Sequence, residues 1–323
     1  MSYKNTLRKL VVSAVFALGS QAAFAAYPEK PIRLVVHFPA GSSTDVIARL
    51  VSEKASDILG QPIVITNKPG ADGAIAAMDI KRSAPDGYSL LIATNSPMSG
   101  VPVMKKQPMY DPVADFTPVA DVGRYSFFVY TRKALPAKTL PEFIAYAKAN
   151  PGKLAYGSGN ITGLLSFAYI ASASGLDMLS VPYKGEPPAI TDMLGGRVDA
   201  MVATAGTGMP QVKAGEFVAL ATVLPSRSPN APDVPTMKEV GLPNFPIAPW
   251  LGVFGPAGMP ADVVSKLNDA FSRALQDPKL AAGLQAQDFM PMPSKPETLQ
   301  ALVKDQLQSH RTLLRQAGLE ASD

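Results

Sequence analysis

The residues best able to do chemistry in this sequence are few. Among its 323 residues are two histidines, His37 and His310, and no cysteine. A serine nucleophile needs a neighbouring base and usually lies in a Gly-x-Ser-x-Gly turn, and the chain has no such motif. The side-chain clusters that usually bind transition metals are missing as well. We therefore expect no catalytic residue, no metal site and no cofactor.

Loops of small residues offer a different kind of chemistry. Residues 39–45, 67–74 and 158–163 each lie between a strand-like and a helix-like stretch, and residues 94–97 end a further strand. The free N–H groups at a helix N-terminus bind an anion without any basic side chain. In open α/β sheets, ligands bind beyond the carboxyl ends of the strands. The loops are thus candidates for an anion site, although every α/β protein needs such turns.

The segment from Gly157 to Gly163 superficially resembles a dinucleotide-binding fingerprint. Its glycines follow the pattern Gly-x-Gly-x-x-x-Gly, in which the third glycine is displaced by one position. The segment also lies in the second half of the chain. Both observations argue against nucleotide binding.

Apolar runs and helical periodicity predict the elements that position these loops. Strands are expected at 32–38, 63–66, 89–94, 127–130, 198–203 and 219–223, with shorter strand-like pieces at 154–156 and 181–185. Helices are expected at 44–59, 76–80, 139–150, 163–174, 187–194, 261–276 and 296–316, with His310 on the polar side of the last. Their alternation predicts a mostly parallel α/β sheet in two halves of similar plan.

The first 25 residues have the features of a secretory signal peptide. Lys4, Arg8 and Lys9 precede an apolar stretch, which ends in Ala23-Phe24-Ala25. We expect cleavage after Ala25 and a periplasmic product, because the apolar stretch is too short to span a membrane. The whole chain carries 30 basic and 26 acidic residues, and cleavage removes three basic ones and no acidic one. A mature charge of +1 excludes nucleic acid as an expected partner.

Six blocks spread along the chain resemble the signature segments of the Bug family, the TctC-like periplasmic substrate-binding proteins of tripartite tricarboxylate transporters. The blocks are residues 39–45, 67–73, 181–185, 195–199, 232–241 and 250–260. The resemblance implies an α/β fold of the type II-like, two-lobed periplasmic-binding-protein kind, with a ligand cleft between the lobes. The first lobe would comprise residues 26–126 and 250–323, and the second residues 127–249.

In that family, backbone amides and bridging waters near the first glycine loop typically hold the carboxylate of a small ligand. Carried over to this chain, the first-lobe side of the cleft would comprise Ala40, Gly41, Ser42, Thr44, Asp45, Asn67, Gly73, Thr94 and Asn95. The second-lobe side would comprise Ser158, Asn160, Thr162 and Tyr183. For three of these residues a structural role is the alternative to ligand contact. Asp45 would cap a helix, Asn67 would form a turn and Tyr183 would pack its ring in a core.

Three departures from the family pattern bear on specificity. Ser42 replaces a usual glycine, Leu164 lies where relatives often have a histidine, and residues 202–206 lack a common aspartate or asparagine. The last two changes predict a more apolar distal pocket.

The sequence therefore predicts a monomeric periplasmic solute-binding protein, without catalytic turnover, that encloses a small carboxylated ligand between two lobes. Its partners would be membrane transporter subunits or, as an alternative, the ectodomain of a membrane sensor. An exported α/β hydrolase is a further alternative, which the missing nucleophile motif disfavours.

Overall fold

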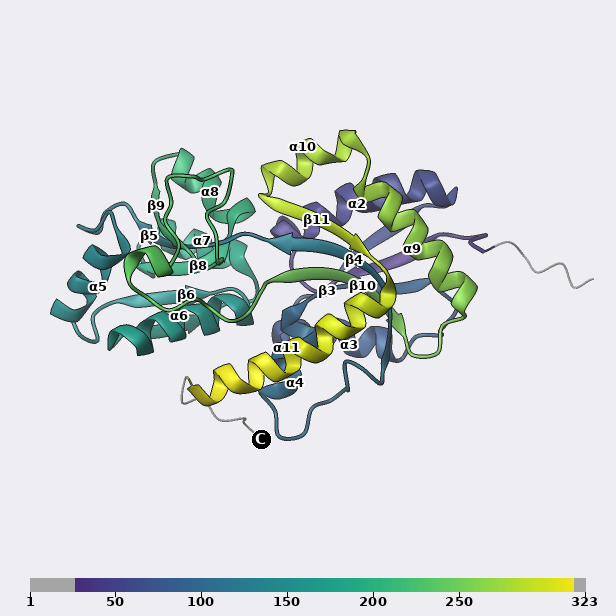
Figure 1. The fold of residues 1–323 in the computed structure, drawn as a ribbon, viewed down its shortest axis with the longest axis horizontal. Coiled ribbons are helices and arrows are strands. Elements are labelled where there is room, and N and C mark those ends of the chain that lie inside the picture. The colour runs from purple at the N-terminus through teal and green to yellow at the C-terminus, as the bar shows by residue number, and fades with distance from the viewer. Residues whose placement is uncertain (1–26, 317–323) are drawn as a thin grey trace, which may run out of the picture.

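The computed structural model describes residues 27–316, which form two α/β lobes (Figure 1). Residues 1–26 and 317–323 lie outside the described part, and so does the expected signal peptide with its cleavage after Ala25. A six-stranded sheet forms the centre of the first lobe, and a five-stranded sheet forms that of the second. The predicted two-lobed α/β fold is confirmed.

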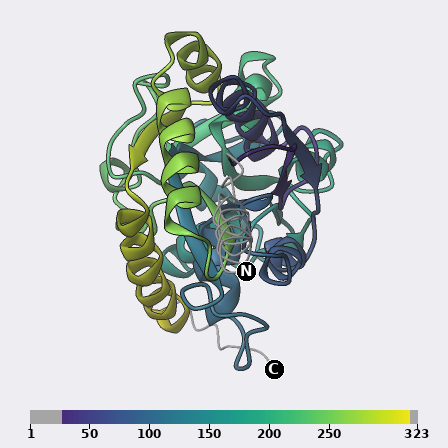
Figure 2. The ribbon, with the colours of Figure 1, turned by 90° about the vertical axis from the view of Figure 1, so that its right-hand side faces the viewer.

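The sheet of the first lobe has the strand order β11-β4-β10-β3-β1-β2. Its strands are β1 (Ile32–Val36), β2 (Ile63–Asn67), β3 (Ser89–Thr94), β4 (Phe116–Tyr125), β10 (Trp250–Pro256) and β11 (Phe289–Ser294). β1 runs parallel to β2 and β3, whereas β10 runs antiparallel to both β3 and β4. In the end-on view of Figure 2, the purple edge formed by β1 and β2 lies opposite the edge strand β11.

Helices cover this sheet on both faces. They are α2 (Ser43–Leu59), α3 (Ala74–Lys81), α4 (Val101–Val103), α9 (Ala261–Leu275), α10 (Pro278–Ala286) and α11 (Pro296–Gln316), with the short turns η1 (Ala71–Gly73) and η2 (Ser96–Gly100). α2 packs against α9 and α10, whereas α11 packs against η2 and α4. α2 begins where Ser42 accepts the Asp45 N–H and ends at Gly60, whose φ of 71° suits glycine.

The second lobe repeats this plan with fewer strands, in the order β7-β6-β8-β5-β9. Its strands are β5 (Phe127–Arg132), β6 (Ala155–Ser158), β7 (Leu179–Pro182), β8 (Ala200–Thr204) and β9 (Phe217–Thr222). Its helices are α5 (Leu140–Ala149), α6 (Ile161–Ser174), α7 (Glu186–Leu194) and α8 (Ala205–Lys213), with the turn η3 (Lys238–Val240). β6 is parallel to β7 and β8, and β5 is antiparallel to β8 and β9.

The chain crosses between the lobes twice. Ser126 alone separates β4 of the first sheet from β5 of the second, and residues 223–249 lead back from β9 to β10. The two crossings are bonded to each other, because the Tyr125 N–H donates to the Pro249 carbonyl oxygen over 3.1 Å. They form a paired connection between the two lobes (Figure 1).

The prediction of a mostly parallel sheet is wrong, because both sheets are mixed. The strands β4, β10 and β11 and the helices α4, α8 and α10 were not predicted from the sequence. β4 contains Pro118 and Gly123, and β10 contains Gly252 and Gly255, which are residues that weaken a strand signal in isolation. Pairing with neighbouring strands decides these segments, since strand formation depends more on context than on local preference.

His310 also departs from its predicted position on the polar side of α11. It is fully buried, and its Nδ1 lies 2.8 Å from the Gln306 carbonyl oxygen. The buried positions Leu299, Val303, His310 and Leu313 recur at helical spacing along α11, so the histidine belongs to the stripe that faces the core. Burial lowers the pKa of His310 to about 4.

We predict that the free energy of unfolding falls less in mild acid when His310 is replaced with leucine. As pH falls below about 6.5, the unfolded histidine gains a proton that the folded histidine does not bind until about pH 4. Each such group lowers the free energy of unfolding by up to about 1.4 kcal/mol per pH unit in that window. Urea unfolding of both proteins between pH 7 and pH 4.5 measures the difference, and equal pH slopes would contradict the assignment.

Candidate binding site

The loops that could bind a ligand lie at equivalent places in the two sheets. In the first lobe, β1 and β3 are neighbours in the sheet. The chain after β1 passes through α2 to β2 at one edge, whereas the chain after β3 continues to β4 toward the opposite edge. In the second lobe, β6 leads through α6 to β7, and β8 leads through α8 to β9 in the opposite direction. A crevice opens beyond the strand ends wherever such neighbours diverge. The two crevices contribute loops to a common cavity.

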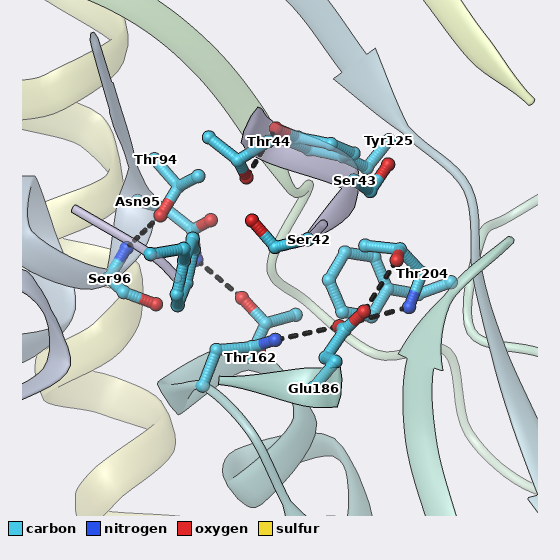
Figure 3. A pocket seen from close by; sticks show the side chains of 13 residues that line it. Ser42, Ser43, Thr44, Thr94, Asn95, Ser96, Tyr125, Thr162, Glu186 and Thr204 are labelled. Carbon is cyan, nitrogen blue, oxygen red and sulfur yellow. Dashed lines mark hydrogen bonds between the residues drawn. The ribbon is translucent and has the colours of Figure 1, made fainter. Parts of the chain in front are cut away.

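We call this cavity the inner cavity, and Figure 3 shows it from close by. Its volume open to water-sized molecules is about 20 Å³, which is room for roughly one water. The residues that line it are Phe38, Ser42, Ser43, Thr44, Thr94, Asn95, Ser96, Tyr125, Phe127, Asn160, Thr162, Glu186 and Thr204. Most of these residues carry a hydroxyl or an amide group, and none of them is lysine or arginine.

The first-lobe wall is built around the N-terminus of α2. Ser42 caps the helix, and Ser43 and Thr44 open its first turn, where N–H groups have no acceptor within the helix. The Thr44 hydroxyl lies 2.8 Å from the Tyr125 hydroxyl, which fixes both side chains. Thr94, the last residue of β3, and Asn95 directly after it lie on the same wall. The wall therefore presents hydroxyls together with the positive end of a helix.

Asp45 and Asn67 hold the loop before α2 rather than line the cavity. The Asp45 carboxylate accepts the Gly41 N–H over 3.0 Å, the Asn67 amide over 2.8 Å and two Arg49 N–H groups. The Asn67 amide also donates to the Phe38 carbonyl oxygen over 3.0 Å. Burial alone would raise the pKa of Asp45, but the bonds from Arg49, Asn67 and Gly41 lower it. These side chains therefore fix the backbone from Phe38 to Gly41.

The second-lobe wall is built around the N-terminus of α6. The Asn160 side chain caps this helix by accepting the Gly163 N–H over 2.8 Å. Its amide nitrogen donates to Glu186, the first residue of α7, also over 2.8 Å. Thr204, the N-cap residue of α8, donates its own N–H to Glu186. Three helix N-termini, those of α6, α7 and α8, thus meet at this wall.

Glu186 is the main feature that sequence reasoning missed. It is an acidic residue with 4% of its surface exposed, at the wall of the cavity. The sequence signal was the pair Gly185-Glu186 directly before two prolines, which starts a helix. An acidic residue in a first helical turn is ordinary, so nothing in the sequence distinguished this one.

The two lobes touch each other across the cleft. The Asn95 amide nitrogen donates to the Thr162 hydroxyl over 2.8 Å. A Cβ at Gly100 would lie 2.8 Å from Ile161, and one at Gly185 would lie 2.7 Å from the ring of Pro39. Glycine at these points lets the backbones approach closely.

A second space, the outer cavity, adjoins the first at Phe38. Its volume open to water-sized molecules is about 280 Å³, and its walls are His37, Phe38, Pro69, Gly70, Ala71, Asp72, Gly73, Gly159, Pro182, Tyr183, Lys184 and Gly185. His37 is buried, and its Nε2 accepts the Thr94 N–H over 3.2 Å. Burial lowers its pKa to about 3, so it is neutral at physiological pH. The Tyr183 hydroxyl is engaged with Asp192 over 2.8 Å.

The structure brings most of the predicted site residues to these two cavities. Ser42, Thr44, Thr94, Asn95, Asn160 and Thr162 line the inner cavity, and Gly73 and Tyr183 line the outer one. Ala40, Gly41, Asp45, Asn67 and Ser158 are absent from both linings. Ser158 is buried at the end of β6 and accepts the Tyr183 N–H through its carbonyl oxygen.

The expected apolar distal pocket rested on Leu164 and on residues 202–206, and only the first of these lies outside the cavity walls. Leu164 is partly buried and packs against the hydrophobic core. Thr204, within the second departing segment, lines the inner cavity beside Glu186 and keeps that wall polar. Ser42 lines the cavity as well.

Residues 27–316 contain neither a cluster of metal-ligating side chains nor a helix suited to cross a membrane. No group of three or more histidine, aspartate or glutamate residues there is placed to hold a metal ion. No helix in this range is long and apolar enough to cross a membrane.

Comparison with known proteins gives consistent matches. The model of the tripartite tricarboxylate transporter family receptor, TctC, matches residues 47–319. A "UPF0065 protein in gbd 5'region" of Cupriavidus necator is 36% identical over 96% of this chain and 95% of its own. Protein BugT of Bordetella pertussis is 33% identical, over 97% of this chain and 98% of its own.

Three solved structures are similar in both sequence and fold. The periplasmic binding protein BugD is 34% identical with a TM-score of 0.87, over 91% of this chain and 99% of its own. Rpa4515 of R. palustris with adipate is 31% identical with a TM-score of 0.88, over 91% and 99%. MatC of Rhodopseudomonas palustris with bound malate is 32% identical with a TM-score of 0.84, over 89% and 100%.

We predict that Gly185→Ala forces the lobes apart. Its new methyl group would lie too close to Pro39 of the first lobe. Gly196→Ala is the matched control, because Gly196 also has a positive φ but no atom within 4 Å of the added Cβ. Small-angle X-ray scattering should give a larger radius of gyration for Gly185→Ala alone. Equal radii for the two variants would contradict the contact.

Proposed function

The chain belongs to the tripartite tricarboxylate transporter family of receptors, and on that premise we propose that it captures a small organic carboxylate between its two lobes for uptake. The observation that carries the proposal is the meeting of helix N-termini and hydroxyl groups around the inner cavity, in a wall without lysine or arginine. N–H and O–H donors of this kind bind a carboxylate. The adipate of Rpa4515 and the malate of MatC are ligands of that chemistry.

Ligand contact is proposed for the predicted residues that line the two cavities. Ser42 and Thr44 would meet the carboxylate from the first lobe, and Asn160 and Thr162 from the second. Gly73 and Tyr183 would contact the part of a longer ligand that extends into the outer cavity. Asp45 and Asn67 would act indirectly, by fixing the loop before α2.

Binding would be coupled to hinge motion at the paired connection. The proposed lobes are residues 26–126 with 250–323, and residues 127–249. The boundaries coincide with Ser126 and with the start of β10. Since the inner cavity has room for roughly one water, entry of a carboxylate requires the lobes to separate and then close on it.

Family membership and the N-terminal sequence support a proposal for export and for partners. The relative BugD is a periplasmic binding protein. We propose that this chain is likewise periplasmic, that its signal peptide is removed after Ala25, and that it acts as a monomer without catalytic turnover. Its proposed partners are the membrane subunits of a tripartite tricarboxylate transporter, and a membrane sensor is the alternative.

We predict that a carboxylate raises the melting temperature of the mature chain. The protein would be unfolded and refolded to remove any bound ligand, then heated with a panel of mono-, di- and hydroxycarboxylates. A ligand at 100 times its Kd adds about 2.7 kcal/mol, which moves the melting temperature by several degrees. No shift with any carboxylate, in protein shown to be refolded, would contradict the proposed function.

A matched pair of variants ties that shift to the inner cavity. Thr162→Val removes a hydroxyl from the cavity wall and should reduce the shift. Thr191→Val removes a hydroxyl from the exposed side of α7, where it bonds the Pro187 carbonyl oxygen, and should leave the shift unchanged. Equal shifts in melting temperature in both variants would show that the ligand binds outside the inner cavity.

A further inference from the structure

The inner cavity already contains a carboxylate that belongs to the chain. Among the residues that line it, Glu186 is the one with an acidic or basic side chain. It lies on the second-lobe wall and points toward Thr204 (Figure 3). No lysine or arginine of the lining neutralises it, and its partners are uncharged.

Four donors saturate this carboxylate. The Asn160 amide and the Thr204 N–H donate to Oε1 over 2.8 and 3.1 Å. The hydroxyls of Thr204 and Thr207 donate to Oε2. Two carboxylate oxygens offer about four acceptor positions, so the hydrogen-bonding capacity of Glu186 is filled by the protein. Burial raises the pKa of Glu186, and the bonds from Thr204, Thr207 and Asn160 oppose that rise.

Without Glu186, the same donors would form a binding site for an anion. A backbone N–H at the N-terminus of α8, an amide and two hydroxyls converge on one carboxylate group there. Such donors, placed at the positive end of a helix, suit a carboxylate of any origin. The occupant in this chain is a side chain that is covalently attached and therefore always present.

We propose that Glu186 occupies a carboxylate subsite of the cavity from within the chain and thereby restricts the ligand to a single carboxylate group. The inference rests on the proposed function and specifies its ligand class. A monocarboxylate can use the donors of the first-lobe wall and of α6 while its apolar part contacts Phe38 and Phe127. A second carboxylate on the ligand would meet a negative charge and donors that are already engaged.

Titration calorimetry with two matched pairs of ligands tests this inference. Hexanoate and adipate have the same chain length and differ in one carboxylate, as do butyrate and succinate. We expect the refolded mature chain to bind the monocarboxylate of at least one pair about tenfold or more tightly than its dicarboxylate. A dicarboxylate that binds as tightly as its matched monocarboxylate, or more tightly, would overturn the inference and leave the proposed function intact.

Variants at position 186 separate a specificity role from a structural one. Glu186→Ala frees the four donors and should raise the affinity for a dicarboxylate about tenfold or more relative to its monocarboxylate. Glu186→Gln keeps the shape, removes the charge and should shift the same ratio in the same direction by less. Glu216→Gln, at an exposed glutamate of the same lobe, is the control that should change nothing.

A purely structural role would lower the melting temperature of the variants and leave the affinity ratios unchanged. Unchanged ratios in whichever of the two variants folds would therefore overturn the inference. If the parent chain binds none of the four ligands, gain of adipate or succinate binding by Glu186→Ala still supports the inference, and no gain overturns it. Failure of the proposed function is recognised separately, as the absence of a shift with the whole carboxylate panel.

Discussion

The divergence of neighbouring strands at the cleft is the constraint on which the rest of the structure depends. In each lobe two parallel strands end side by side, and the chain after them turns in opposite directions. Backbone N–H groups at the following helix N-termini are then left facing the cleft, where they need acceptors. Because the lobes place these ends against each other, one cavity receives donors from both sheets. Its selectivity for anions is thus a property of the backbone arrangement before any side chain is considered.

Side chains refine this arrangement in two ways. Asp45, Arg49 and Asn67 fix the loop before α2 from behind, so that the loop needs no contact with a ligand to keep its shape. On the other wall, Glu186 connects the loops after β6, β7 and β8 through Asn160 and Thr204. The loop on the first-lobe wall is thereby held in place for a ligand oxygen. On the second-lobe wall, some hydrogen-bond donors are already bonded to Glu186. The cavity is asymmetric in charge although its two halves share a topology.

Much of this could be predicted from the sequence, where the signals are local. The spacing of apolar residues and the caps gave α2, α9 and α11 close to their observed bounds, and the small-residue loops pointed to the cleft. The strands β4, β10 and β11 escaped prediction because distant partners stabilise them. Asp45 and Asn67 were predicted to line the cleft, but their side chains bond the loop backbone and each other, which spacing does not reveal. Glu186 could not be distinguished, because its burial depends on three loops that meet only in the folded chain.

The position of β10 sets the order in which the lobes can be completed. This strand lies between β3 and β4, yet it follows the whole second lobe in the sequence. A chain emerging from its N-terminus therefore presents every strand and helix of the second lobe before the first sheet can close. Until residues 250–256 arrive, β3 has one unpaired edge and β4 has two, because β4 pairs with β10 and with the still later β11. Such edges are prone to wrong pairing. The lobe whose strands begin the described chain is therefore the lobe that is completed last.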